Sequence, residues 1–373
     1  METRTALNEI REERGVSAAQ LAKMAGVSRQ TIYAIEAGDY VPNTALALHL
    51  ARILEVRVED LFQLEAEPAA PAPPVRVDLL DGHDAGRKGQ PVQLCKVGKR
   101  MMAVSASAQP LMLPLADGVV VTNSPRTHQA DVQVFAGELE EGKRLLVAGC
   151  DPGVSLLSLH LARYHDSDLV VASASSQQAL DWLKQGKVHV AGSHLRDTAS
   201  GEYNLPVVKR LFPNGAVKVV TFAIWEQGLV IANGNRKNIR GVEDLARQDI
   251  SIVNREKGAG SRALLDSKLR AAGVAPQQVH GYDRLASGHL PAALAVSQGE
   301  ADCCIATRSA ARAFGLTFIP LATERYDLIV ARQYLRLPAI QALLDLLNRA
   351  AIRKKLEVLA GYDTSHTGEV LVN

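Results

Sequence analysis

The sequence is poor in aromatic residues, which make up only 4 % of its 373 positions. RNA-binding sheets stack bases on such rings, so this scarcity argues against an RNA-binding surface. There are only four cysteines, namely Cys95, Cys150, Cys303 and Cys304. None belongs to a C-x-x-C pair, and no Cys/His group has the spacing of a zinc site. We therefore expect unpaired thiols and no metal centre.

Long apolar runs are also missing. No stretch reaches the roughly 18 apolar residues that a membrane-spanning helix needs. The charged start, METRTALNEIREERG, contains no apolar signal-peptide core. We expect a cytoplasmic protein that makes no contact with a membrane. The formal net charge of +2 is too small to argue for or against nucleic acid, and the chain length indicates two or three domains.

The first 66 residues contain the start and stop signals of several short helices. Helical patterns end at Gly15, Gly26 and Gly38, while Ser17 and Ser28 stand where N-caps are expected. Two of these helices flank the tight turn AGV, which is the arrangement of a helix-turn-helix. In that motif the second helix presents its N-terminal side chains to base edges in the major groove.

The stretch LAKMAGVSRQTIYAIEAGDYVPNTALALHLARILEVRVEDLF closely resembles the XRE family of Cro/repressor-like helix-turn-helix proteins. We assign residues 1–66 to such a domain; the alternative is a helical hairpin used only for protein contacts. The resemblance implies operator contacts by Gln20, Ser28, Arg29, Gln30, Thr31 and Tyr33, with Gln20 on a phosphate. Residue chemistry agrees for Arg29 and Gln30, which can make bidentate contacts with guanine and adenine. The domain holds seven Lys/Arg and ten Asp/Glu, so we expect low affinity for random DNA.

The rest of the chain divides into three parts. Residues 67–75 are rich in proline and alanine and predict an extended spacer. Residues 76–142 contain strand patterns with turns at Gly98 and Gly118, and we interpret them as a small β-rich connecting segment. In residues 143–373, apolar strands alternate with amphipathic helices, which is typical of an α/β fold with largely parallel strands. The length of this last region favours two lobes.

Ligands bind at the carboxyl ends of strands in open α/β sheets, and one loop expected there reads NREKGAGSR (254–262). It is not a Walker P-loop, because no Lys-Ser/Thr follows its glycines. GAGSRA fits the pattern of a dinucleotide fingerprint, but the acidic residue that would follow, Asp283, lies in a loop pattern. A plain strand–helix turn is another possibility. We favour an oxyanion cradle formed by the N–H groups of residues 259–262 and the Ser261 hydroxyl.

Several longer runs, among them GLVIANGNRKNIRGVEDLARQDISIVNREKGAGSRALLDSKLRAAGV, AGSHLRDTASGEYN and LAGYDTSHTGEV, are similar to periplasmic binding proteins of the molybdate-binding type. The resemblance implies two α/β lobes, joined by crossing strands near residues 220–232 and 321–331, that close over a ligand. It favours molybdate or tungstate as that ligand. No feature of the sequence selects these anions over sulfate, phosphate or a small organic acid.

The loops at the strand ends supply ten candidate ligand contacts: Cys150, Asp151, Ser193, His194, Asn254, Ala259, Gly260, Ser261, Arg262 and His289. For some of them a structural role is the alternative. Asp151 either contacts the ligand or caps the next helix, and Arg262 either supports the cradle or faces solvent. The two histidines either contact the ligand or are hydrogen-bonded structural residues.

A binding-protein fold behind a DNA-reading head resembles ligand-sensing transcription factors. We therefore predict a regulator that binds double-stranded operator DNA as a homodimer and senses a small oxyanion. No nucleophile and general base stand at a sequence spacing that indicates a catalytic pair. We therefore assign no catalytic residue and expect no enzymatic activity. The alternatives are a regulator that senses a different small molecule, a nucleotide-dependent enzyme fused to a DNA-binding module, and a protein-interaction regulator with an inactive cleft.

Overall fold

The computed structural model describes residues 3–64, 73–80, 86–106, 115–124, 127–135, 142–197 and 199–372. These residues divide into two compact units, 1–73 and 74–373. Most of the predicted spacer lies outside the described residues, and its last residue, Val75, already opens a strand. Among the described residues, no helix combines the length and apolar character needed to cross a membrane.

The first unit contains five helices and one small antiparallel sheet. The helices are α1 (Leu7–Glu13), α2 (Ala18–Ala25), α3 (Arg29–Glu36), α4 (Thr44–Leu54) and α5 (Val58–Leu61). Their buried faces form one core, which includes Leu7, Leu21, Ile32, Ile35 and Leu50. The sheet pairs β1 (Thr3–Thr5) with β2 (Phe62–Leu64) and so joins the two ends of the unit.

The predicted caps of the central helices are present. Ser17 and Gln20 form a capping box at the start of α2, and Gly26 ends that helix in the left-handed conformation. The Ser28 hydroxyl accepts a hydrogen bond from the Thr31 N–H at the start of α3. The C-cap of α3 is Ala37, one residue before the predicted stop at Gly38. These caps fix the turn between the two helices.

Five strands that lie between Val75 and Val134 form a closed barrel. Its strands are β3 (Val75–Leu79), β4 (Pro91–Val97), β5 (Arg100–Ser105), β6 (Gly118–Ser124) and β7 (Gln129–Val134), in the order β3-β5-β4-β6-β7. Val92, Leu94 and Val132 belong to its own core. Cys95 and Met102 instead join a core that includes Leu146 and other residues of the adjoining lobe. The barrel is therefore packed on that lobe.

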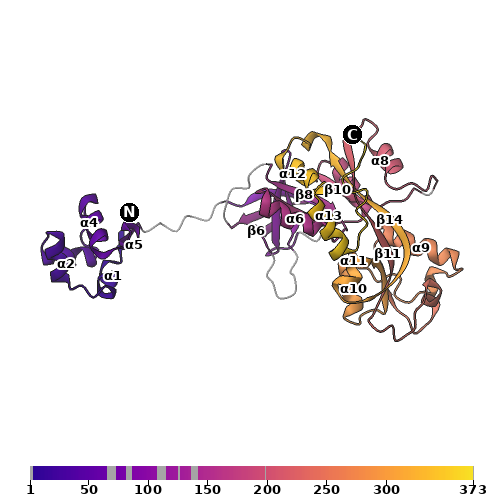
Figure 1. Ribbon diagram of the computed structural model, residues 1–373, viewed down its shortest axis with the longest axis horizontal. Helices are drawn as coiled ribbons and strands as arrows, with labels where there is room; N and C mark the ends of the chain where they lie inside the picture. Colours follow the sequence, from indigo (N-terminus) through magenta and orange to yellow (C-terminus); the bar gives the residue numbers. More distant parts are fainter. Residues whose placement is uncertain are drawn as a thin grey trace. The chain divides into compact units, whose positions relative to one another are not determined.

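A single eight-stranded sheet runs through the remainder of the second unit. Its strand order is β12-β13-β11-β14-β10-β8-β9, with β15 paired to β11. Only the outer pairs β12/β13, β10/β8 and β8/β9 are parallel. The expectation of largely parallel strands is thus wrong for the middle of the sheet, where β11 (Val217–Ile231) and β14 (Thr317–Ala331) run antiparallel to each other. These two long strands cross from one lobe to the other (Figure 1).

The lobes take their other elements from separate parts of the chain. The first lobe contains β8 (Arg144–Gly149), α6 (Val154–Tyr164), β9 (Asp168–Ser173), α7 (Ser176–Lys184), β10 (Val190–Ser193), α8 (Leu205–Leu211), α12 (Pro338–Leu347), α13 (Ala350–Lys355) and β15 (Val370–Val372). The second lobe contains β12 (Ile252–Val253), α9 (Gly260–Ala271), α10 (His289–Ser297), β13 (Cys303–Thr307) and α11 (Arg308–Ala313). Short 3-10 turns at Val242–Ala246, Pro276–Gln278 and Arg332–Tyr334 and a π-helical turn at Leu356–Ala360 complete the connections.

Each lobe has apolar cores on both faces of the sheet. In the first lobe, Leu145 and Leu157 pack with Ile340 and Leu343 of the late helix α12. In the second lobe, Cys303 and Cys304 point to opposite faces of β13 and enter different cores. Residues buried on both sides explain why the strands read as nearly continuous apolar runs. The carboxyl ends of β8, β10 and β12 and the start of α10 supply the polar loops.

Candidate functional site

The N-terminal end of α3 presents an exposed polar surface. Ser28, Arg29, Gln30 and Tyr33 are exposed, as is Gln20 on α2. The Arg29 guanidinium donates to the Tyr33 hydroxyl at 2.7 Å and lies over its ring. Thr31 is half-buried, and its hydroxyl lies 2.8 Å from that of Ser28. All six predicted DNA-contacting residues thus lie on α2 or at the start of α3, and whether they contact DNA stays a prediction.

The predicted ligand contacts come from loops of both lobes. Cys150 follows β8 and Ser193–His194 end β10 in the first lobe. Asn254 follows β12, residues 259–262 open α9, and His289 opens α10 in the second lobe. The structure brings together Cys150, His194, Gly260, Ser261 and His289. Whether they bind a ligand is a prediction that the geometry alone does not test.

The centre of this cluster is a set of three side chains that could hold a metal ion. One ligand atom from each of Cys150, His194 and His289 lies within 4.8 Å of the other two. The Cys150 Sγ is 3.6 Å from Nε2 of His194. Both histidines are buried and the cysteine is half-buried. The chain separations are far outside zinc-site spacings, so only the fold reveals this donor set, which the sequence analysis did not expect.

A chain of hydrogen bonds holds the His194 ring in place. Its Nδ1 lies 2.7 Å from Oε2 of Glu324 on β14. The amide of Gln227 on β11 donates to the same carboxylate oxygen, and its own carbonyl accepts from the Ser261 hydroxyl at 2.6 Å. Burial opposes protonation of His194, but the neighbouring Cys150 and Glu324 outweigh it and raise its pKa. The ring is therefore oriented with Nε2 toward Cys150.

His289 has the opposite environment. Its side chain is 1 % exposed, and neither ring nitrogen has a hydrogen-bond partner among the described residues. Burial, and then the positive charges of Arg255 and His194, hold its pKa well below the usual value. An imidazole in this state is neutral near pH 7 and has a free lone pair. Unpaired buried polar groups are rare in folded proteins, which marks the ring as a candidate ligand-binding group.

Aromatic rings form one wall of the cluster. The Trp225 ring lies 5.0 Å from the His194 ring and 5.3 Å from the His289 ring, centroid to centroid. Tyr326 stacks on the other side of His194 at 5.9 Å. Trp225 and Tyr326 are themselves 4.9 Å apart. Such a wall excludes water and keeps the polar centre in a low-dielectric environment.

Arg255 is a charged neighbour that the sequence analysis missed. Only 2 % of it is exposed, and its guanidinium contacts the Glu256 carboxylate at 2.9 Å. Interactions with Glu256 and with Cys150 raise its pKa against the effect of burial. Its signal in the sequence was a charged residue directly after an apolar strand, between the candidates Asn254 and Ala259.

Five predicted contacts also have structural roles, and whether they contact a ligand stays a prediction. Asp151 accepts from the Gly153 N–H, just before α6, and from the Tyr362 hydroxyl. The Ser193 carbonyl accepts from Asn204. Asn254 bonds its own loop through the Arg255 N–H and the Tyr282 carbonyl. Arg262 neither faces solvent nor reaches the cluster, because it lies over the Tyr282 ring and donates to the Arg255 carbonyl. Ala259 is buried and serves as the N-cap residue of α9.

Glu324 and Gln227 were missed because they lie inside long strands. Breaks in apolar periodicity reveal the loops that form a binding site. A polar residue within an apolar strand does not show from the sequence alone whether it has a functional role. The only available signal was a carboxylate inside the otherwise largely apolar run TFIPLATERYDLIV. The pairing of β11 with β14 then sets Trp225 directly opposite Glu324.

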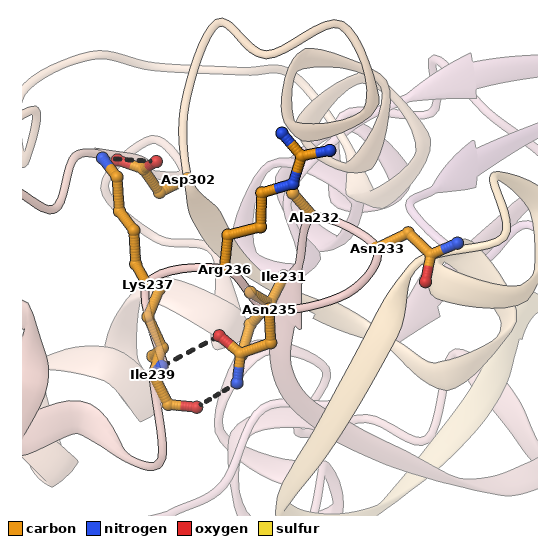
Figure 2. A pocket seen from close by; sticks show the side chains of 8 residues that line it. All are labelled: Ile231, Ala232, Asn233, Asn235, Arg236, Lys237, Ile239 and Asp302. Carbon is orange, nitrogen blue, oxygen red and sulfur yellow. Dashed lines mark hydrogen bonds and ion pairs between the residues drawn. The ribbon is translucent and has the colours of Figure 1, made fainter.

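A separate hollow of about 270 Å³ lies on the second lobe alone (Figure 2). Its lining includes Lys237, which pairs with Asp302 at 2.7 Å. It also includes Asn235, whose amide bonds both the N–H and the carbonyl of Ile239. These three side chains are already paired, whereas Figure 2 draws no hydrogen bond or ion pair for Arg236 and Asn233, which also line the hollow.

Comparison with known proteins identifies the family. Residues 159–348 match the family described as PBP superfamily domain. The chain belongs to this PBP family. Residues 7–61 match the helix-turn-helix family, so an XRE-type domain is joined to a two-lobed PBP-like domain, as the two resemblances implied. The molybdate type of that resemblance stays a prediction.

Individual relatives cover both parts. YvgK of Bacillus subtilis (strain 168) is 36 % identical over 244 residues, which are 65 % of this PBP-family chain and 79 % of YvgK. The HTH-type transcriptional regulator YgzD of the same organism is 44 % identical over 61 residues, which are 16 % of this chain and 92 % of YgzD. The sulfate-binding protein SubI from Mycobacterium tuberculosis H37Rv aligns with a TM-score of 0.45 at 20 % identity, over 59 % of this chain and 86 % of SubI.

Proposed function

We propose that this chain is a transcription regulator whose affinity for operator DNA is controlled by a small ligand held between the two lobes. One observation carries the proposal: a buried polar cluster built from both lobes occurs in a chain that also has an exposed recognition helix. Relatives that are HTH-type transcriptional regulators support the DNA-binding half. The PBP family supports the ligand-binding half.

The recognition helix α3 would read the operator. Arg29 and Gln30 are exposed and have the geometry for bidentate contacts with guanine and adenine. Ser28, Thr31 and Tyr33 would contact neighbouring base edges, and Gln20 would contact a phosphate. A single domain of this size buries little DNA surface, so we propose that a homodimer binds a palindromic site. Operator binding would require the protein to act in the cytoplasm.

The effector class predicted from the sequence is an oxyanion, molybdate or tungstate. Two features support a negative ligand: the N-terminal end of the twelve-residue helix α9, where free N–H groups favour anions, and the buried Arg255 guanidinium. A regulator that senses another small ligand at the same cluster is the second candidate. It is favoured by the three convergent side chains Cys150, His194 and His289.

Closure of the lobes would supply the signal. A ligand can shift a conformational equilibrium only by the difference in its affinity for the two states. Coupling free energies of about 1–3 kcal/mol correspond to roughly 5–150-fold changes in the affinity of a second ligand. Contacts between the lobes are already present, since the Ser173 hydroxyl donates to the Ser287 carbonyl at 3.2 Å. Ligand-dependent opening or closing of the two lobes near this contact would be the motion that changes DNA binding.

The test uses the full chain, reduced and stripped of metal. Duplexes are first selected from a random library to define the operator. Melting temperature and operator affinity are then measured with molybdate, tungstate, sulfate, phosphate and transition-metal ions. A single ligand class that raises the melting temperature and changes operator affinity supports the proposal. The absence of any sequence-specific duplex, or of any ligand effect on DNA affinity, rejects it.

A further inference from the structure

The cluster between the lobes has the side chains of a metal site rather than of an anion site. The potential metal-binding atoms at its centre are a thiol sulfur and imidazole nitrogens, within 4.8 Å of one another. Thiolate and imidazole together select ions such as Zn²⁺ and Cu⁺. Typical bonds are about 2.3 Å for Zn–S and about 2.0–2.1 Å for Zn–N. Two ligand atoms of one tetrahedral Zn²⁺ are therefore about 3.3–3.6 Å apart, so rearrangements of about 1 Å would bring all three donors onto one ion.

The state of His289 points the same way. Its ring is fully buried, and both nitrogens lack a partner among the described residues. A metal ligand must be a neutral imidazole with a free lone pair. His289 is the first residue of α10 in the second lobe, whereas Cys150 and His194 belong to the first lobe. A bound ion would therefore join the two lobes directly.

His194 has the partner that metal-binding histidines usually have. Its second nitrogen, Nδ1, lies 2.7 Å from the Glu324 carboxylate, which leaves Nε2 facing Cys150. Carboxylate–histidine pairs of this kind fix the tautomer of the ring and strengthen the metal bond. Gln227 holds the carboxylate in turn and is itself bonded to Ser261. The second lobe therefore supports a metal ligand of the first.

The side chains that would be needed for an oxyanion are already engaged. The Ser261 hydroxyl donates to Gln227, and the Asn254 amide is bonded within its own loop. Arg255 is paired with Glu256, which offsets its positive charge. Glu324 and a metal-bound Cys150 thiolate would add two negative charges beside the donors. This balance suits a cation better than a dianion.

We propose that Cys150, His194 and His289 bind a thiophilic transition-metal ion, of the Zn²⁺ or Cu⁺ kind, and that this ion is the ligand that closes the cleft. The inference rests on the proposed function, because it names the ligand class of the same site. Binding releases two protons to solvent, the thiol proton of Cys150 and the Nε2 proton of His194. It leaves a position on the ion open to water or to a further ligand. The three donors come from both lobes, and only closure of the lobes brings them together. An open cleft would therefore bind the ion weakly.

The direct test is a titration of the full-length, reduced, metal-free protein with Co²⁺ as a spectroscopic stand-in for Zn²⁺. We expect one Co²⁺ per chain, with a thiolate-to-cobalt charge-transfer band in the ultraviolet and intense visible bands of a four-coordinate ion. Zn²⁺ should displace the Co²⁺. A separate anaerobic arm measures Cu⁺ by competition with a chromophoric chelator. The absence of the thiolate band together with failure of the chain to compete for Zn²⁺ or Cu⁺ overturns the proposal.

Variants show whether these three residues are the ligands. Cys150→Ser and His289→Gln should each weaken Zn²⁺ binding by more than about 100-fold, and Glu324→Gln by about 10–100-fold. Cys95→Ser and His366→Gln are the matched controls, because Cys95 is buried between the barrel and the first lobe and the His366 ring bonds the exposed Glu369. Circular dichroism and metal-free melting check that each variant folds. A charge-transfer band that survives in folded Cys150→Ser contradicts the assignment.

The two proposals fail in different ways. If molybdate raises the melting temperature and changes operator affinity while Zn²⁺ and Cu⁺ do not bind, the metal inference is wrong and the regulator stands. If Zn²⁺ binds at the three residues but operator affinity is the same with and without it, the metal site stands and its role as effector is wrong. Both results can be read from the same full-length preparation.

Discussion

Gly260, the first residue of α9, packs against the His194 imidazole of the other lobe. A β-carbon at Gly260 would lie 2.3 Å from Cε1 of that ring, which is far closer than two carbon atoms can approach. The first lobe carries the ring and the second carries the glycine. This contact therefore limits how closely the two lobes can approach each other.

Gly260→Ala should therefore hold the lobes apart while α9 keeps its stability. Alanine favours an ordinary helix position over glycine by about 0.5–1 kcal/mol. Overpacking costs about 1–3 kcal/mol, so we expect affinity for Zn²⁺ or molybdate, whichever the unchanged chain binds, to fall roughly 5–150-fold. Titration calorimetry measures the effect, and Ser267→Ala on the exposed side of α9 is the control. Unchanged affinity in Gly260→Ala would show that closure does not need this contact.

The recognition helix makes a separate prediction. Replacing Arg29 and Gln30 together by alanine removes two bidentate base contacts, each contributing about 1–3 kcal/mol. Operator affinity should fall by roughly 30-fold or more, and affinity for random DNA much less. Fluorescence anisotropy with both duplexes separates the two effects. Arg52→Ala removes a comparable exposed charge from α4 and should leave the preference for the operator intact. If the Arg29/Gln30 double variant kept its preference for the operator, the bases would have to be contacted by a different surface.

Asn204 holds the loop that carries His194. It is fully buried, its Oδ1 accepts from the Leu195 N–H at 2.9 Å, and its Nδ2 donates to the Ser193 carbonyl and to Asp327. Asn204→Ala removes these hydrogen bonds, although Asp327 keeps its ion pair with Arg325. The loss should lower the free energy of unfolding by about 2–4 kcal/mol. Urea denaturation measures it against the exposed control Asn214→Ala. Equal losses in the two variants would mean that Asn204 does not secure the loop.

His189 predicts how stability depends on pH. Burial lowers its pKa to about 4, and its Nδ1 accepts from the Leu146 N–H at 3.0 Å. In the unfolded chain, His189 binds a proton as the pH falls through about 6.5. In the folded chain, His189 binds that proton only near pH 4. Stability should therefore fall as the pH drops from about 6.5 to about 4, by about 3 kcal/mol from this group.

His189→Asn places an amide oxygen near the position of Nδ1 and removes the titration. Its free energy of unfolding should change less than that of the unchanged chain between pH 7 and pH 4.5. Chemical denaturation at several pH values supplies the comparison. Parallel pH profiles for the two proteins would show that His189 is not the group responsible.

Local signals accounted for much of the fold. Serine caps and glycine stops located α2 and α3, because capping depends on a few neighbouring residues. The crossing strand expected near residues 220–232 is present as β11 (Val217–Ile231). Its antiparallel pairing with β14, and the closure of five strands into a barrel, depend on partners far along the chain and could not be predicted from periodicity.

The candidate site was predicted in part for the same reason. Cys150, His194 and His289 stand in loops after strands or at helix starts, where polar residues are visible against apolar surroundings. Glu324 lies 130 residues from His194 in sequence, and only the pairing of β14 with its neighbours brings the two together. Asp151 and Arg262 were visible in the same loops, but their bonds to Tyr362 and to the Arg255 carbonyl take them out of the cluster.

The central claim is that a ligand between the lobes changes the affinity of the chain for its operator. The most direct measurement is the operator dissociation constant of the full-length protein, by anisotropy, without ligand and with saturating Zn²⁺, Cu⁺ or molybdate. The account predicts a change of roughly 5–150-fold with one of these ligands, which His289→Gln abolishes. The same dissociation constant in all four conditions would contradict it.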